Sequence, residues 1–87
     1  MTTWQRDPRV LWRRSGDRRI LALPDLPEVT VVDGTGGVIW DLLADPQPEP
    51  DLIETLAGAF EVEVSVVQSQ VMPFLDQLCA LGAVQRR

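Results

Sequence analysis

Residues 28–43, EVTVVDGTGGVIWDLL, change from one periodicity to another, and this change limits the fold more than any other feature of the sequence. β-Branched residues dominate Glu28–Val32, which is typical of a strand. Beyond Asp33 the apolar residues recur at the spacing of one helical face: they are Val38, Ile39, Leu42 and Leu43. The predicted helix ends near Asp45, so a strand here leads directly into a helix, as in a mixed α+β fold.

The glycines between this strand and this helix do not match a nucleotide-binding loop. A dinucleotide fingerprint requires a third glycine at the position that Ile39 occupies. A phosphate-binding P-loop requires Lys and then Ser or Thr after its last glycine, whereas Gly37 is followed by Val38. We interpret these glycines as residues that permit a sharp turn, with Asp33 or Thr35 capping the helix.

Two strands are predicted before this segment and two helices after it. Val10–Arg14 and Arg18–Leu23 are rich in β-forming residues, and the small polar residues between them suit a hairpin turn. Apolar residues at helical spacing predict one helix over Pro50–Phe60 and another over Val64–Leu81. The predicted fold is α+β and winged-helix-like, with a three-stranded antiparallel sheet followed by three helices.

The last predicted helix contains an internal proline. Pro73 has no backbone N–H to donate, and its ring crowds the preceding turn, so we expect a kink or a break between Ser69 and Pro73. Gly82 follows the last apolar residue and is typical of the position just past a helix C-terminus.

Length and composition indicate one small domain over residues 1–87 that binds no cofactor. Residues 1–9, which include Trp4, are interpreted as an arm that need not be ordered. The single cysteine, Cys79, and the absence of histidine exclude a structural zinc site and an internal disulfide. No apolar run approaches the ~20 residues of a membrane span, and no targeting leader is recognisable, so we expect a cytoplasmic protein without a membrane partner.

Charge is distributed unevenly along the chain, whose net charge is −5. Residues 1–23 contain six arginines and two aspartates, whereas residues 24–85 contain eleven carboxylates and no Lys or Arg. Four of the arginines lie in the predicted hairpin: Arg13, Arg14, Arg18 and Arg19. They form either a solvated strand face, which deters aggregation, or a docking site for an acidic partner.

The sequence lacks most side chains on which catalysis depends. It has no His, Lys or Tyr, which removes the usual general bases, Schiff-base formers and phenolic acids. Cys79 stands among leucines of the last helix, where we expect an unreactive thiol. Glu61 and Glu63 are interpreted as solvated carboxylates, and the chain is therefore predicted not to be an enzyme.

Two kinds of binding remain open from the residues alone. Domains of winged-helix shape often bind DNA, but residues 64–84 contain no Lys or Arg that could contact phosphates. The alternative is peptide binding, because a free edge on the third strand could accept an added strand beside the last helix. Apolar residues of that helix, such as Val67, Val71 and Phe74, would line the groove or belong to the core.

Three motifs follow one another in an order that resembles the PqqD-like family, the precursor recognition elements of ribosomally made and post-translationally modified peptides (RiPPs). They are TVVDGTGGVIWDLL, DLIETLAGAF and VMPFLDQLCALGAV, and the likeness covers about Val10–Val84. The resemblance implies a leader peptide that adds as a strand to the third strand and lies against the third helix. The peptide-binding residues that it implies are Val29, Thr30, Val31, Val32, Val67, Gln70, Val71, Phe74 and Leu78.

Details of these motifs distinguish branches of the family. Members from pyrroloquinoline quinone synthesis usually have Asn and then Thr-Ala after the third strand, where this chain has Asp33 and Thr35-Gly36. The segment GTGGVIWDLLADP resembles more closely the corresponding segment of the free-standing leader-binding proteins of lasso peptide biosynthesis. That likeness implies a leader peptidase and a macrolactam synthetase as partners. The alternatives are a PqqD-type peptide chaperone for a radical SAM enzyme in quinone cofactor biosynthesis, or a winged-helix DNA-binding protein.

Overall fold

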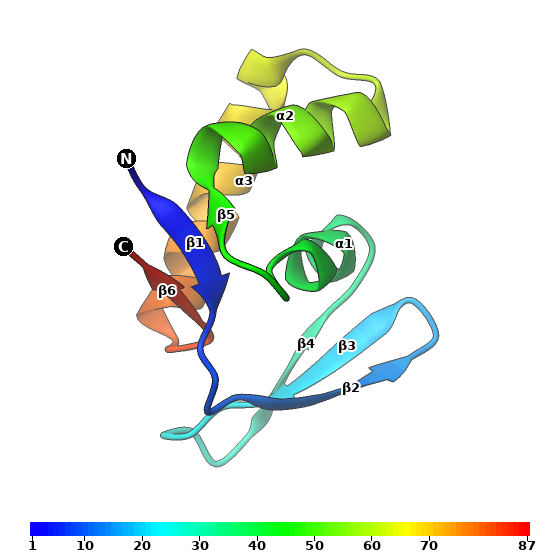
Figure 1. Ribbon diagram of the computed structural model, residues 1–87. Helices are drawn as coiled ribbons and strands as arrows, with labels where there is room; N and C mark the ends of the chain where they lie inside the picture. Colours follow the sequence, from blue (N-terminus) through cyan, green and yellow to red (C-terminus); the bar gives the residue numbers. More distant parts are fainter.

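A computed structural model describes residues 1–87 as two small sheets and three helices (Figure 1). The strands are β1 (Thr3–Arg6), β2 (Leu11–Ser15), β3 (Arg18–Ala22), β4 (Val29–Val32), β5 (Gln47–Pro48) and β6 (Val84–Arg86). The helices are α1 (Thr35–Leu42), α2 (Glu49–Phe60) and α3 (Val64–Ala80). The α+β class is confirmed, together with a three-stranded antiparallel sheet and three helices, while the likeness to a winged helix stays a prediction.

The predicted sheet has the strand order β2-β3-β4, and both of its pairings are antiparallel. All three strands lie within one residue of their predicted bounds. Gly16 forms the β2–β3 turn with a φ of 64°, which glycine adopts without a steric penalty. Side chains alternate across the sheet, so Leu21 and Val32 are buried on one face, whereas Val29 and Val31 are exposed on the other.

The helices follow the predicted apolar stripes only in part. Ile39 and Leu43 are buried as predicted, whereas Val38 is exposed and Trp40, which lies outside the predicted stripe, is fully buried. Pro50 lies in the first turn of α2, where its missing N–H has no helical partner to lose. Directly after α3, Gly82 has a φ of 83° and its N–H donates to Cys79 O, as expected of a residue just past a helix.

α3 continues through Pro73 without interruption, so the break expected between Ser69 and Pro73 is absent. Proline removes one backbone hydrogen bond, which frees the carbonyl of Ser69. Ser69 and Pro73 are both exposed, and water can therefore satisfy that carbonyl. On its other side α3 buries Val67, Val71, Leu75 and Leu78, and this packing holds the helix together across the proline.

A second sheet, with the order β5-β1-β6, was not predicted from the sequence. The interpretation of residues 1–9 as an unordered arm is corrected, because β1 is the central strand of this sheet. Trp4 is fully buried, and its indole N–H donates to Glu49 at 2.9 Å. Thr3 and Arg87 exchange backbone hydrogen bonds of 2.8 and 2.9 Å, which places the two termini side by side (Figure 1).

One core of eighteen buried hydrophobic residues joins the two sheets and the three helices. Its largest side chains are Trp4 and Trp40, which come from β1 and α1. Because elements from the whole length of the chain contribute, neither sheet is an independent unit. None of the three helices has the length and apolar character needed to span a membrane.

Candidate functional site

β4 is an edge strand with one open side. Its residues pair with β3 from Ala22↔Val29 to Arg19↔Val32, and no strand pairs with its other side. Val29 and Val31 are 60% and 50% exposed, whereas Val32 is buried and Thr30 is partly buried. An edge of this kind offers unpaired N–H and C=O groups to an extended chain.

A cavity of about 230 Å³ lies between α1 and α3, close to the end of β4. Its lining residues are Thr35, Gly36, Ile39, Gln70, Val71 and Phe74. A Cβ atom built on Gly36 would lie 3.0 Å from Cζ of Phe74 and 3.5 Å from Cβ of Val32. The half-buried Phe74 ring therefore reaches the position where β4 ends, and a strand added to β4 would pass beside the cavity.

The glycines of the β4–α1 junction serve packing in addition to the turn. Gly34 is the N-cap residue of α1 with a φ of 52°, and no side chain caps this helix, so the predicted cap by Asp33 or Thr35 is wrong. Gly36 leaves room for the Phe74 ring, and Gly37 lies where a Cβ would be 3.2 Å from the backbone oxygen of Asp17. The close approach of α3 and of the hairpin turn to α1 explains why small residues follow one another here.

The structure brings together only part of the predicted peptide-binding set. Val32, Gln70, Val71 and Phe74 surround or adjoin the cavity, next to the open edge formed by Val29, Thr30 and Val31. Val67 and Leu78 do not line the cavity; they are 4% and 2% exposed and pack in the core. A direct role of these two residues in binding stays a prediction, and their observed contacts are those of core residues.

The four hairpin arginines do not form one surface. Arg19 is only 6% exposed, and its Nε and Nη2 donate to the two carboxylate oxygens of Asp41 at 2.9 and 2.7 Å. This residue faces the helices, because it lies two positions before the buried Leu21 on the same strand. The prediction that Arg19 belongs to an exposed docking face is therefore corrected, while Arg13, Arg14 and Arg18 are exposed as expected.

Two of the carboxylates that pair with arginines, Asp41 and Asp7, have a pKa below the usual range of an aspartate. Hydrogen bonds from Arg19 lower the pKa of Asp41, and hydrogen bonds from Arg9 lower the pKa of Asp7. The same contacts raise the pKa values of Arg19 and Arg9. The Arg19–Asp41 pair joins β3 to α1, so it supports the frame that carries β4 and the cavity.

The face of the larger sheet that points away from the helices is largely apolar. We call it the outer face; it carries Leu11, Arg13, Ile20, Ala22, Val29 and Val31. Leu11 is 74% exposed, and a shallow hollow of about 330 Å³ lies along this face with Arg13 at its side. Exposed apolar clusters with a polar rim are typical of interaction surfaces. Strand alternation in the sequence places these residues together, although it does not tell which face the helices cover.

Sequence reasoning also missed an arginine held between two tryptophans. The Arg6 guanidinium lies 4.6 Å from the ring centroid of Trp12 and 4.7 Å from that of Trp40, and its Nε donates to the Trp40 backbone oxygen at 2.9 Å. The two indole rings meet edge to face at 6.0 Å. This contact links the end of β1 to β2 and α1, and only the unpredicted position of β1 brings Arg6 there.

These features define a small α+β domain with an open sheet edge beside an apolar cavity, which is the architecture of a peptide-binding module. The sequence profile of the family described as Coenzyme PQQ synthesis protein D (PqqD) matches residues 19–84, which is more than half of the chain. The chain therefore belongs to the PqqD family, as predicted, and it is a peptide-binding RiPP recognition element. No curated protein and no solved structure matches it.

Proposed function

We propose that this chain is a non-catalytic adaptor that binds the leader segment of a ribosomally synthesised precursor peptide by strand addition to β4. The open edge of β4 beside the Phe74 cavity, in a chain of the PqqD family, is the observation that supports this proposal. Main-chain hydrogen bonds to Val29–Val32 would supply affinity, and the cavity would supply specificity by admitting one apolar leader side chain. The groove would comprise these strand residues with Gln70, Val71 and Phe74 of α3.

The branch that we propose is lasso peptide biosynthesis. Asp33 and Gly36 depart from the Asn and Ala that are usual in quinone synthesis, and GTGGVIWDLLADP is closer to the free-standing lasso leader-binding proteins. In the structure Gly36 makes room for Phe74, so a residue with a larger side chain at this position would change the shape of the cavity. A chaperone for a radical SAM enzyme of quinone biosynthesis remains the alternative within the family.

A leader peptidase and a macrolactam synthetase are the proposed enzyme partners. The adaptor would raise the concentration of the precursor near these enzymes, which is a gain from tethering that requires no catalytic group. The outer face offers them an apolar surface with Arg13 and Arg18 exposed beside it, and neither arginine has an ion-pair partner within the chain. Such a surface would suit a partner with an apolar centre and an acidic rim.

The proposal is tested by fluorescence anisotropy with a labelled peptide that matches the leader of the precursor encoded beside this chain's gene. A random DNA duplex of equal label intensity serves as the control at two salt concentrations. Saturable leader binding without a DNA response is expected. Salt-sensitive DNA binding without leader binding would contradict the adaptor and favour the nucleic-acid alternative.

The branch within the family is tested by leader cleavage. Purified leader peptidase from the same gene neighbourhood is mixed with the full-length precursor, with and without this chain. We expect the chain to accelerate cleavage, and to do so only for a precursor that it binds. Unchanged cleavage, together with tight binding of a quinone-precursor peptide, would instead favour the radical SAM chaperone.

A further inference from the structure

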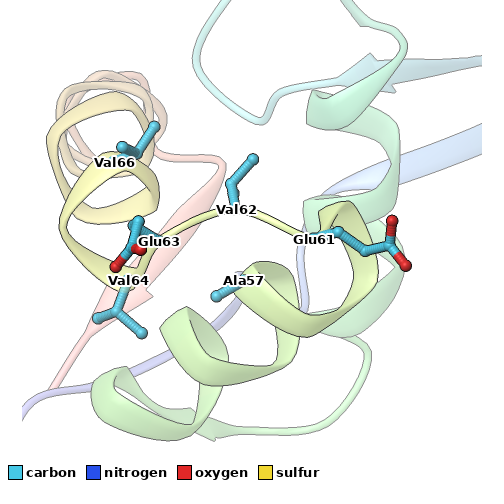
Figure 2. A pocket seen from close by; sticks show the side chains of 6 residues that line it. All are labelled: Ala57, Glu61, Val62, Glu63, Val64 and Val66. Carbon is cyan, nitrogen blue, oxygen red and sulfur yellow. The ribbon is translucent and has the colours of Figure 1, made fainter.

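A second hollow, of about 650 Å³, lies where α2 turns into α3 (Figure 2). We call it the α2–α3 hollow; its lining residues are Ala57, Glu61, Val62, Glu63, Val64 and Val66. The three valines are each at least 40% exposed. Figure 2 shows Val62 and Val66 projecting to the same side of the turn, while Val64 projects to the opposite side. Exposed branched residues beside an open hollow form a surface that an apolar side chain can cover.

This hollow continues the groove along α3. Val66, Gln70 and Phe74 are spaced four residues apart and therefore lie along one side of the helix. Gln70 and Phe74 line the cavity beside β4, and Val66 lines the α2–α3 hollow. Eight residues of helix span about 12 Å, a distance that about four residues of extended peptide cover. A peptide that leaves the end of β4 would thus reach the hollow within a few residues.

The charge at the hollow selects the kind of peptide that fits it. Glu61 and Glu63 are exposed, and no arginine forms an ion pair with either of them. The chain has no Lys or Arg between residues 24 and 85, so no side chain of that region can neutralise them. Complementarity therefore favours a segment that carries positive charge next to an apolar residue.

We propose that the α2–α3 hollow binds the part of the leader that flanks the strand added to β4, and that this flank carries a branched apolar residue and Lys or Arg. The inference rests on the proposed function and specifies its ligand. The basic residues would lie about four residues from the one that enters the Phe74 cavity, on the side of the peptide beyond Val32. Glu61 and Glu63 would contact them, and Val62 and Val66 would contact the apolar residue.

The experiment selects peptides from a random 16-residue display library on the immobilised full chain and measures the affinity of the enriched peptides by anisotropy. The test variant is Glu61→Gln/Glu63→Gln. The matched control is Asp51→Asn/Asp76→Asn, which removes the same number of negative charges away from the hollow. Asp51 lies in the first turn of α2, and Asp76 lies on α3, where its carboxylate faces Arg86. Val66→Ser tests the apolar part. Circular dichroism confirms that each variant is folded.

We expect the enriched peptides to share a strand-forming core and a basic cluster at a fixed distance on one side. Glu61→Gln/Glu63→Gln should weaken these peptides by about three- to tenfold at low salt, because exposed charge pairs contribute little individually, and the control should leave them within about twofold. Enriched peptides without a basic cluster, or equal weakening by both double variants, would overturn the inference and leave strand addition intact. No enrichment at all would overturn strand addition as well.

Self-association would also overturn the inference. In that case the arginine-rich hairpin of a second copy would occupy the hollow. Light scattering after size-exclusion chromatography would then show an oligomer for the wild type and a monomer for Glu61→Gln/Glu63→Gln. A wild-type monomer is the expected result, because the proposed occupant of the hollow is the leader peptide and not a second copy of the chain.

Discussion

At the scale of single residues, Phe74 and Gly36 shape the candidate site more than the predicted strand residues do. The Phe74 ring is half-buried against the core and borders the cavity, and Gly36 lets it approach α1. Periodicity identified Phe74 from the sequence, because the apolar stripe of α3 includes it. The role of Gly36 could not be predicted, since it depends on a contact between two helices.

Substituting Phe74 by Ala should weaken leader binding at least about tenfold while the domain stays folded, because a buried anchor side chain typically contributes ~2 kcal/mol or more. Anisotropy measures the binding, and circular dichroism measures the fold. The control is Leu75→Ala, which removes a fully buried side chain and should destabilise the domain by about 2–5 kcal/mol. An unfolded Phe74→Ala variant would assign Phe74 to the core and remove it from the site.

The Arg19–Asp41 pair predicts a pH dependence of stability. The folded-state pKa of Asp41 is lowered, so the pair stabilises the folded chain above the unfolded pKa of about 4 and loses this effect as pH falls through the lowered value. Urea denaturation of wild type and Asp41→Asn at pH 7 and pH 3 measures it. We expect the wild type to have a larger free energy of unfolding than Asp41→Asn at pH 7, and this difference between the two proteins to shrink at pH 3. A difference that stays constant with pH would contradict the assignment.

At the scale of elements, the sequence predicts the sheet that carries the site and misses the sheet that closes the domain. The β2-β3-β4 strands alternate clearly and are joined by recognisable turns, and all three helices have regular apolar stripes. β5 and β6 contain only two and three residues, and β1 (TWQR) lacks the run of β-branched residues that identifies β4. Their pairing joins segments more than forty residues apart in the chain, which local sequence does not encode.

Trp4 should therefore contribute more to stability than Trp12, although both tryptophans lie near the N-terminus. Trp4→Ala removes a fully buried side chain and should cost about 3–5 kcal/mol, whereas Trp12 is 40% exposed and its replacement should cost clearly less. Urea denaturation followed by circular dichroism compares the two variants. Equal losses, or a larger loss for Trp12→Ala, would contradict the central position of β1.

At the scale of the whole molecule, the fold separates a basic hairpin from an acidic helical region. Arg13, Arg14 and Arg18 lie on β2 and β3, whereas Glu61 and Glu63 lie at the α2–α3 turn, and β4 lies between the two regions along the chain. The separation was visible in the sequence as a count of charges. The arrangement of these charges around the open edge of β4 could not be predicted, because the sequence does not show which arginine is buried.

This separation predicts that leader binding and enzyme docking can be uncoupled. Arg13→Glu should leave leader affinity within about twofold, because Arg13 lies on the outer face and on the strand farthest from the β4 edge. The acceleration of leader cleavage by the peptidase should fall, since the acidic rim proposed for that enzyme would now be repelled. Arg87→Glu is the control with the same charge change. Equal effects of both variants would attribute the loss to net charge alone.

Strand addition to β4 is the central claim, and amide hydrogen exchange measured by NMR tests it most directly. The full chain is compared with and without a saturating concentration of the leader peptide. The account predicts slower exchange for those amides of Val29–Val32 that point away from β3, since only an added strand can bond them. Tight leader binding that leaves every β4 amide unchanged, with protection elsewhere, would contradict it.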